Sequence, residues 1–384
     1  MKFKIETSKF AELLGDVQLP AAKVGVAGTS LVLVEAEAGE AAEDGVVKFT
    51  ASDLDVTVTR TLKANIERPG MCAVHSRKLL AISRSLPSQV AEVRTNPDKS
   101  KLGIFSGTAK ATLPTIPTDE FPAREVFSSG KEISLEEGVL HDCLSKVHYA
   151  AAKDGTRYIC MGVCIQSDGE SVKFVATDTK RVSVSETSHQ GADSFKVVVP
   201  SRTVERLLKI LPRSKEIAKI TVYPSNIIFD WTGGRLESKL IEGEFPNYAP
   251  LVEQMESRAR VVVDRDNLLN AVRRASGAGG GDKVVSVCLR AANLADKGSL
   301  GDSQGAIVVS LPESVEGTYS EVIPLDSAPE KESKVAFFSE YIIEPLSVSP
   351  SKTLVFRYGE SGEICFFEDG ERLLSIIATV REAT

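Results

Sequence analysis

The sequence predicts an α+β fold of three similar domains, each with two helices packed on antiparallel sheets. Two repeated patterns carry this prediction: six copies of a short apolar strand followed by an amphipathic helix, and an acidic-Phe-Pro element after the second and the fourth copy. Short apolar segments fill the intervals between the helices, as antiparallel strands do. At 384 residues, the chain also exceeds the about 250–300 residues at which a single core stops growing.

The clearest copy of the strand–helix unit is FKVVVPSRTVERLLKILP, residues 195–212. Its apolar residues recur at helical spacing and form one stripe. Its cations recur on a different face of the same helix, and they are Arg202, Arg206, Lys209 and Arg213. The other five copies begin at Lys2, Met71, Lys131, Arg260 and Lys334. A Ser, Thr or Asp near each helix start predicts side-chain capping, and Pro345 predicts that the sixth helix is short or displaced.

The domain boundaries follow from the second repeated signal. TDEFP at 118–122 closes the second unit and EGEFP at 242–246 closes the fourth, so the units pair into domains. We place these domains at residues 1–124, 125–252 and 253–384. The strands predicted between the helices are Val46–Thr50, Asp55–Leu62, Val172–Ala176, Val182–Glu186, Ile220–Tyr223, Ile227–Trp231, Ala306–Leu311, Thr353–Tyr358 and Glu363–Phe367.

Charge is distributed unevenly along the chain. The six predicted helical segments together carry a net charge of +6, whereas the whole chain carries −7, which leaves −13 for everything else. A protein with basic helices and an otherwise acidic surface can hold a polyanion at one place and repel it elsewhere. Ordinary solvated helix faces are the alternative explanation of this pattern.

Composition argues against several other classes of protein. No apolar run approaches the roughly 18 residues of a membrane span, and the N-terminus lacks the apolar core of a signal peptide, so we expect a cytoplasmic protein without membrane contact. The six cysteines lie singly in apolar segments, which predicts buried thiols; Cys160 and Cys164, four residues apart, are the nearest approach to a metal pair. We expect no metal and no cofactor.

Residues 174–186, FVATDTKRVSVSE, carry a resemblance to a known family. This strand, Ala-Thr-Asp turn and Arg-containing strand resemble those of bacterial DNA polymerase III β subunits, the β sliding clamps. IEGEFPNYAPLV at 241–252 is similar to the inter-domain segment of that family, and MKFKIE with SDLDVTV at 52–58 is similar to its first domain. The resemblance covers essentially the whole chain.

The resemblance implies the DNA clamp fold and a ring, usually a head-to-tail homodimer, that encircles double-stranded DNA without reading its sequence. Such a ring confers processivity in replication and tethers the DNA polymerase III catalytic subunit; its partners include the clamp loader and other clamp-binding polymerases and repair proteins. A positive lining attracts phosphates of any sequence. Helical spacing assigns that lining to Arg77, Lys78, Arg84, Lys146, Lys153, Arg202, Arg206, Lys209, Arg273 and Arg274.

In this family, partner peptides dock in an apolar groove between the second and third domains. Carried over by position, the groove comprises Cys160, Thr177, Thr179, Lys180, Arg181, Val182, Pro246, Leu251, Ile376, Thr379 and Val380. Thr179-Lys180 stands where the family often has Gly-His, and residues 376–381 replace a Met-Pro-Met run. We therefore expect the same location with a shallower, stiffer groove, and a C-terminus extended slightly by residues 382–384.

The sequence also predicts how the ring would close. The family joins its first and third domains by edge strands; here ASGAGGGDK, 275–283, and Lys110-Ala111-Thr112 predict a weaker or more polar contact.

We expect no enzyme, because the histidines are scattered, no GxSxG or HExxH motif occurs, and the glycine run at 277–281 reads as a flexible connection. Asp178 reads as a turn residue that caps its own backbone. A β-rich protein-binding scaffold without DNA encirclement and an unrecognised hydrolase are the alternatives.

Overall fold

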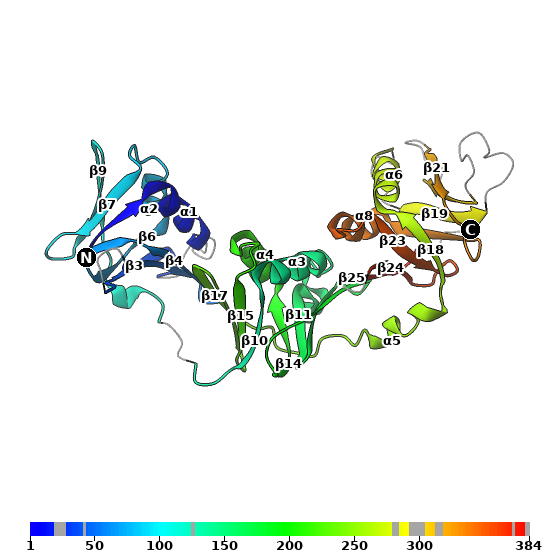
Figure 1. The fold of residues 1–384 in the computed structure, drawn as a ribbon, viewed down its shortest axis with the longest axis horizontal. Coiled ribbons are helices and arrows are strands. Elements are labelled where there is room, and N and C mark those ends of the chain that lie inside the picture. The colour runs from blue at the N-terminus through cyan, green and yellow to red at the C-terminus, as the bar shows by residue number, and fades with distance from the viewer. Residues whose placement is uncertain are drawn as a thin grey trace. The chain divides into compact units, whose positions relative to one another are not determined.

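The computed structural model describes residues 1–18, 28–40, 44–123, 127–278, 284–291, 304–311, 318–370 and 373–380 (Figure 1). The chain folds into two compact units. The first unit comprises Met1–His141, Gln190–Phe195 and Arg202–Leu240. The second comprises Asp142–His189, Lys196–Ser201 and Ile241–Thr384. Helices and antiparallel sheets occur in both units, which confirms the predicted α+β class.

All six predicted strand–helix units are present. In each of them the helix begins at the residue directly after the strand ends. The pairs are β1 (Lys2–Glu6) with α1 (Thr7–Val17), β6 (Gly70–His75) with α2 (Ser76–Ser83), β10 (Lys131–Glu136) with α3 (Glu137–His148), β14 (Ser194–Pro200) with α4 (Ser201–Ile210), β18 (Ala259–Asp264) with α6 (Arg265–Ala278), and β22 (Ser333–Phe338) with α8 (Ser339–Val348).

The direct passage from strand to helix changes how the helices are capped. Asp264 caps α6 as predicted, because its carboxylate accepts the Asn267 backbone N–H at 2.8 Å. For α1, α2 and α8 the capping prediction is wrong: the residue before each helix makes no side-chain cap bond. The hydroxyl residue is instead the first helical residue and bonds to other segments; Thr7, for example, donates to the Ser88 carbonyl at 2.9 Å.

The proline in the sixth helix has less effect than the sequence suggested. Helix α8 continues through Pro345 to Val348 and has 10 residues, the same length as α4. The expectation of a short helix is therefore wrong. The Ser349 backbone N–H still bonds to the Pro345 carbonyl at 3.2 Å, so the last turn remains closed.

The first unit contains two antiparallel sheets. The five-stranded sheet has the order β5 (Asn65–Arg68), β1, β7 (Val90–Thr95), β8 (Lys101–Ser106), β9 (Ala109–Pro114). The eight-stranded sheet has the order β10, β15 (Ile217–Val222), β16 (Asn226–Trp231), β17 (Gly234–Lys239), β4 (Val56–Lys63), β3 (Val46–Ser52), β2 (Leu31–Glu37), β6. The pairing of β17 with β4, in which Leu236 lies opposite Val58, joins segments far apart in the sequence.

The second unit repeats this plan. Its eight-stranded sheet has the order β14, β11 (Gly162–Asp168), β12 (Ser171–Thr177), β13 (Arg181–Ser188), β25 (Leu373–Ile377), β24 (Cys365–Asp369), β23 (Thr353–Tyr358), β18. Its four-stranded sheet has the order β21 (Ser320–Leu325), β20 (Gly305–Ser310), β19 (Val284–Ala291), β22. The segment 241–258 carries only the short helix α5 (Ala249–Val252) and the 3-10 turn Met255–Ser257. The nine strands predicted from the sequence are all present, with ends displaced by at most three residues.

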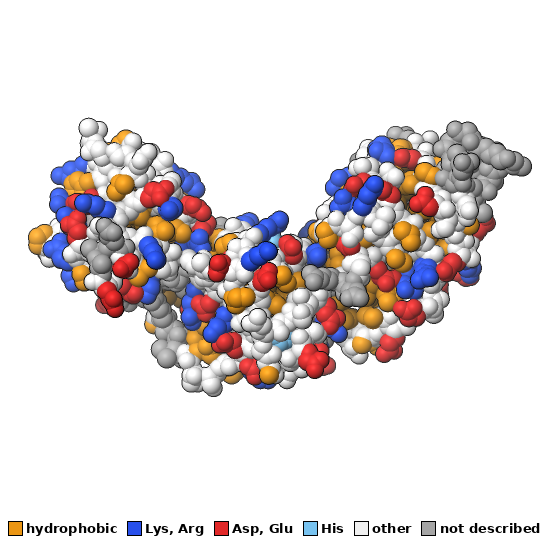
Figure 2. Space-filling model, viewed as in Figure 1, with side chains coloured by type: hydrophobic (Ala, Val, Ile, Leu, Met, Phe, Trp, Pro, Cys, Tyr) orange, Lys and Arg blue, Asp and Glu red, His pale blue; other side chains and the backbone are white. Residues whose placement is uncertain are grey.

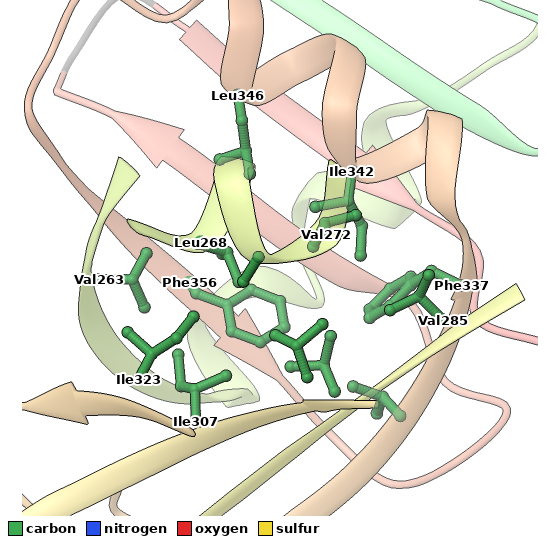
Figure 3. Packing of buried hydrophobic residues seen from close by; sticks show 14 of the residues in the cluster. Val263, Leu268, Val272, Val285, Ile307, Ile323, Phe337, Ile342, Leu346 and Phe356 are labelled. Carbon is green, nitrogen blue, oxygen red and sulfur yellow. The ribbon is translucent and has the colours of Figure 1, made fainter. Parts of the chain in front are cut away.

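The apolar stripes of α6 and α8 pack against a sheet. Figure 3 shows Leu268 and Val272 of α6 and Ile342 and Leu346 of α8 gathered around Phe356 of β23. All five side chains are at least 98% buried, which is the arrangement the helical spacing predicted. No helix in the described part of the chain is long and apolar enough to cross a membrane.

Candidate functional site

The predicted cations of the first unit lie mainly on exposed helix faces. On α2, Leu79 and Leu80 are buried, whereas Arg77 and Lys78 on the opposite face and Arg84 at the helix end are exposed. On α4, Arg202 and Lys209 are exposed; the Arg202 side chain lies 3.9 Å from the Asp55 carboxylate. We call these five cations the basic helix face; they are Arg77, Lys78, Arg84, Arg202 and Lys209.

Arg206 does not belong to this face, although helical spacing placed it there. Its guanidinium donates to Oδ2 of Asp53 at 2.9 Å, and only 12% of its side chain is exposed, against 0% for Asp53. Oδ1 of the same carboxylate accepts the backbone N–H groups of Asp55 and Val56. The charge of Arg206 is therefore neutralised inside the protein, and Arg206 holds the turn after β3 against α4.

The predicted cations of the second unit differ in how exposed and paired they are. Arg274 is bound by both carboxylate oxygens of Glu321, at 2.6 and 3.0 Å, and this hydrogen bonding raises the pKa of Arg274. Arg273 is exposed and donates to the Ser347 hydroxyl at 3.1 Å. Lys146 is half-buried on α3, whereas the Lys153 side chain is 79% exposed and its Nζ lies 4.0 Å from the Glu344 carboxylate. Lys153 and Arg273 thus remain the accessible cations of the predicted set in this unit.

Figure 2 shows how these charges appear on one face of the molecule. Lys and Arg side chains gather over α4, whereas acidic and basic side chains alternate over most of the remaining visible surface. The pattern agrees with basic helices on an otherwise acidic chain. Such a distribution favours phosphate contacts at the helices.

The second predicted site is centred on the turn between β12 and β13. Asp178 Oδ1 accepts the backbone N–H groups of Lys180 and Arg181 at 2.9 and 3.0 Å, as expected for a turn Asp. Thr177 is buried; its hydroxyl donates to the Arg181 carbonyl and accepts the Thr179 N–H. Thr179 has a φ of 77°, a left-handed conformation that a β-branched residue rarely adopts. Local hydrogen bonds therefore hold the turn in one strained shape.

Arg181, predicted to line the groove, is buried and serves to hold this turn. Its guanidinium binds the Asp178 and Glu344 carboxylates and donates to the Tyr149 carbonyl at 3.0 Å. It also stacks on the rings of Tyr149 and Tyr341, at 5.3 and 4.7 Å from their centres. Burial alone would lower the pKa of Arg181, but the two carboxylates outweigh burial and raise it. Arg181 therefore ties the turn to α8.

Three of the predicted groove residues meet in one apolar cluster. Val182 and Ile376 lie directly opposite each other in the β13–β25 ladder, and Leu251 of α5 packs against the same cluster. On β13 the alternate residue Ser183 points to the other face, where its hydroxyl donates to the Lys146 carbonyl of α3. One face of this sheet therefore contacts α3, and the opposite face carries Val182 and Ile376 in an apolar cluster with residues of the segment 241–258.

The remaining predicted groove residues are placed differently. Lys180 is exposed, Pro246 is half-buried next to the buried Phe245, and Cys160 is fully buried. Thr379 and Val380 form hydrogen bonds with residues outside the predicted groove set. The Thr379 hydroxyl donates to the Glu363 carbonyl and accepts the Gly362 N–H, and the Val380 N–H donates to the Ala336 carbonyl at 2.7 Å.

Sequence reasoning missed several residues of this cluster. They include Ile159, Val184, Phe245, Tyr248, Ile364 and Leu374. Phe245 and Tyr248 stand in the EGEFPNY segment that was already singled out, and Val184 follows Val182 at the two-residue spacing of a strand face. Those signals could have found three of the six.

Nothing in the described part of the chain resembles a metal centre. Five cysteines are buried and Cys288 is half-buried, and no group of three or more His, Cys, Asp or Glu residues among those described could hold a metal ion. Burial raises the pKa of the Cys164 thiol to about 12, so Cys164 stays protonated at neutral pH. A role for Cys160 and Cys164 as a metal pair has no support.

The paired strand–helix units on long antiparallel sheets define a DNA clamp fold. The structure aligns over its whole length with a crystal structure of the DNA polymerase sliding clamp from Bacillus subtilis, at a TM-score of 0.87 and 22% identity, covering 100% of both chains. A sliding clamp from Pseudomonas aeruginosa, solved bound to griselimycin, aligns with a TM-score of 0.85 at 21% identity over 99% of both chains.

Sequence comparison gives the family directly. The model of the DNA polymerase III beta subunit N-terminal domain matches residues 1–125, and that of the central domain matches residues 134–247. The curated beta sliding clamp of Bacillus subtilis (strain 168) is 24% identical over 360 residues, covering 91% of this chain and 90% of that one. The chain belongs to the family of DNA polymerase III beta subunits, the sliding clamps of DNA replication, which are processivity factors without catalytic activity.

Proposed function

We propose that the chain closes into a ring as a head-to-tail homodimer, encircles double-stranded DNA in the cytoplasm without reading its sequence, and tethers the replicative polymerase. Membership of the sliding clamp family carries this proposal, and the exposed cations of the basic helix face support it. Phosphate contacts are independent of sequence, and enclosure supplies the persistence that weak contacts lack. The scaffold without DNA encirclement is not favoured, because it leaves the basic helices without a role.

Retention on circular DNA tests encirclement. The chain, loaded on a nicked plasmid, should stay bound through gel filtration and dissociate when a restriction enzyme linearises the plasmid. A protein that only adheres to DNA would be retained equally on both forms, which would contradict the proposal.

The contribution of the basic helix face needs a charge reversal that spares Arg206. Reversal of Arg206 together with Arg202 and Lys209 would place a carboxylate against buried Asp53 and unfold the turn. The variant Arg202→Glu/Lys209→Glu avoids this conflict. It should weaken loading on DNA and flatten its salt dependence by about two units of slope. Lys99→Glu/Lys101→Glu, on the exposed β7–β8 hairpin, is the matched control and should behave as wild type.

We also propose three domains, at 1–124, 125–252 and 253–384, each with two strand–helix units. The matched ranges of the two family models, 1–125 and 134–247, support the first two. Ring closure would then pair an edge strand of the first domain with one of the partner's third domain. The candidates are β9 and β21, which both lie at a sheet edge. Ala275–Ala278 end α6, and residues 279–283 of the glycine-rich segment lie outside the described residues.

Strand β9 allows a sharp test of this closure. Ser106 pairs with Ala109 across a two-residue turn, so alternate residues from Ala109 onward bond to β8 and the N–H groups of Lys110 and Thr112 point outward. Thr112→Pro removes one outward donor without removing a bond within the sheet. We expect wild type to sediment as a dimer at micromolar concentration and Thr112→Pro as a monomer. A dimer of unchanged stability in Thr112→Pro would exclude closure through β9.

We propose that the cluster of Val182, Leu251 and Ile376 binds extended peptides of partner proteins. These partners are the DNA polymerase III catalytic subunit, the clamp loader, and other clamp-binding polymerases and repair proteins. An apolar cleft with a few polar groups suits a peptide with one or two bulky anchors. The Met-Pro-Met run of the family is replaced by residues 376–381, of which Arg381 lies outside the described residues with 382–384, so a different peptide preference is expected.

The test of the groove uses charged substitutions within it. Val182→Asp and Leu251→Asp should each abolish binding of a polymerase-derived peptide in fluorescence anisotropy while the dimer remains intact. Val262→Asp, at a 56% exposed valine on β18, is the control. Deletion of residues 376–384 is a poor test, because Ile376 and Ile377 pair with both β13 and β24. Retained binding in both groove variants would place the site elsewhere.

A further inference from the structure

A cavity lies on the same sheet face as the proposed peptide groove. It has a volume of about 630 Å³, within the range of small-ligand sites. Val184 of β13 and Leu374 of β25 contribute its apolar floor, and Tyr248, Val252 and Met255 of the covering segment contribute its apolar walls. None of the eleven groove residues predicted from sequence lines it.

The register of the β13–β25 ladder relates this cavity to the groove. Val182 lies opposite Ile376, and Val184 lies opposite Leu374. Residues two apart on a strand point to the same face and are about 6.6 Å apart. All four side chains belong to one apolar cluster, together with the covering residue Tyr248. The cavity therefore lies one side-chain position further along β13 and β25, on the same apolar surface that carries Val182 and Ile376.

We propose that this cavity is a second anchor subsite of the peptide groove, which takes another bulky apolar side chain of the same extended peptide. The inference rests on the proposed peptide-binding function. An extended peptide that runs parallel or antiparallel to β13 presents side chains to one face at the same two-residue spacing as the floor. One peptide can therefore fill both positions without a turn.

The charges around the cavity indicate what flanks that anchor. Lys173 pairs with Glu186 at 3.5 Å, and Glu368 is bound by Arg357. Lys196 and Glu253 are exposed, and neither forms an ion pair with any residue that the structure describes. The rim thus offers one cation and one anion, which suits a peptide with acidic and basic residues on either side of the anchor. A run of one sign would meet a like charge.

The experiment uses the full chain and peptides that tile the polymerase III catalytic subunit of the same organism. The probe is the tiled peptide whose binding is lost in Val182→Asp. Leu374→Trp fills the cavity from its floor, and Ala249→Trp, at an exposed lining residue, blocks its mouth with less risk to folding. Val262→Trp, on β18 outside the cavity, is the matched control. Thermal melting and sedimentation confirm folding and the dimer for each variant.

We expect both filling variants to weaken the probe about tenfold and the control to leave it unchanged. A probe whose second apolar residue is changed to alanine should bind wild type and the filling variants equally, because it no longer enters the cavity. Equal binding of the unchanged probe to wild type and to folded Ala249→Trp would overturn the proposal, as would a small apolar molecule found there with the peptide bound. If every tiled peptide binds Val182→Asp as tightly as wild type, the groove itself fails and the subsite fails with it.

Discussion

Arg206 forms a buried ion pair with Asp53, although helical spacing places Arg206 among the surface cations. A substitution that removes the charge of Arg206 should therefore lower the free energy of unfolding strongly. The perturbation is Arg206→Met, which keeps much of the side-chain volume and removes the charge. It leaves the Asp53 carboxylate, which has no exposed surface, without its guanidinium partner. The backbone N–H groups of Asp55 and Val56 still bind its other oxygen.

The magnitude follows from the cost of an uncompensated buried charge. Removal of one partner of a buried ion pair costs about 3–5 kcal/mol. Since 12% of the Arg206 side chain is exposed, some water can reach the site, and we expect about 3 kcal/mol. Lys209→Met on the same helix, at an exposed position, should change the free energy of unfolding by no more than about 0.5 kcal/mol. Both substitutions remove a cation from the same helix, and the two positions differ in burial and pairing.

Urea unfolding followed by tryptophan fluorescence provides the assay. Trp231 is the one tryptophan of the sequence and lies in β16 of the same unit as Asp53 and Arg206. The midpoint should fall by about 1 M for Arg206→Met and stay within error for Lys209→Met. Adding Asp53→Asn to Arg206→Met should restore part of the loss, because the amide carries no charge. Equal midpoints for the two single variants would refute the reasoning.

Three further outcomes follow from the structure. Burial raises the pKa of three thiols to about 12, so in the native protein they should resist a thiol reagent at pH 8 and react on unfolding; these are Cys72, Cys164 and Cys365. Burial raises the pKa of Asp230 above its ordinary value of 3.8, although Arg235 at 3.5 Å offsets part of the shift, so the contribution of Asp230 to stability is present below that value and is lost as the pH rises through the raised pKa. Asp230→Asn should therefore raise the melting temperature at pH 7 and leave it unchanged at pH 3. Leu54→Gly and Thr179→Gly should each raise stability by about 1 kcal/mol in urea unfolding, because both residues have positive φ; a loss in either would mean that its side chain outweighs the strain.

The sequence was sufficient to predict the helices and strands, but it did not show which charged residues form ion pairs. The strand–helix unit predicted to begin at Lys2 is present as β1 and α1, because an apolar stripe is a local property. Periodicity could not separate Arg206 from Lys209, since the two differ only in what packs beside them. Asp53 is 153 residues away in the chain, and no local pattern reports that distance.

The groove shows the same limit at Arg181. A family motif brought attention to the turn, but the Arg181 side chain points inward, toward Glu344 of α8 and the ring of Tyr341. Its partner lies 163 residues further along the chain. By contrast, Val182 and Ile376, which were carried over from the family by position, lie opposite each other in the β13–β25 ladder, and the alternation that fixes the face of each side chain is a local property of its strand. Apolar positions are therefore recoverable from pattern, whereas the use of a charge depends on distant packing.

The two Asp turns show what the internal repeat preserved and what it altered. Asp53 and Asp178 each accept the backbone N–H groups two and three residues later, and the residue after each has a φ of 74° or 77°. Each turn connects two antiparallel strands, and the second of these strands also pairs with a strand from later in the chain. Strand β4 pairs with β17, and β13 pairs with β25. Each second carboxylate oxygen binds an arginine, but Asp53 takes Arg206 from α4 whereas Asp178 takes Arg181 from its own turn. The backbone conformation is therefore common to both turns, and the source of the cation distinguishes them. Asp53 ties helix α4 to the sheet, whereas Asp178 binds within its own turn, next to Val182 of the apolar cluster proposed to bind peptides.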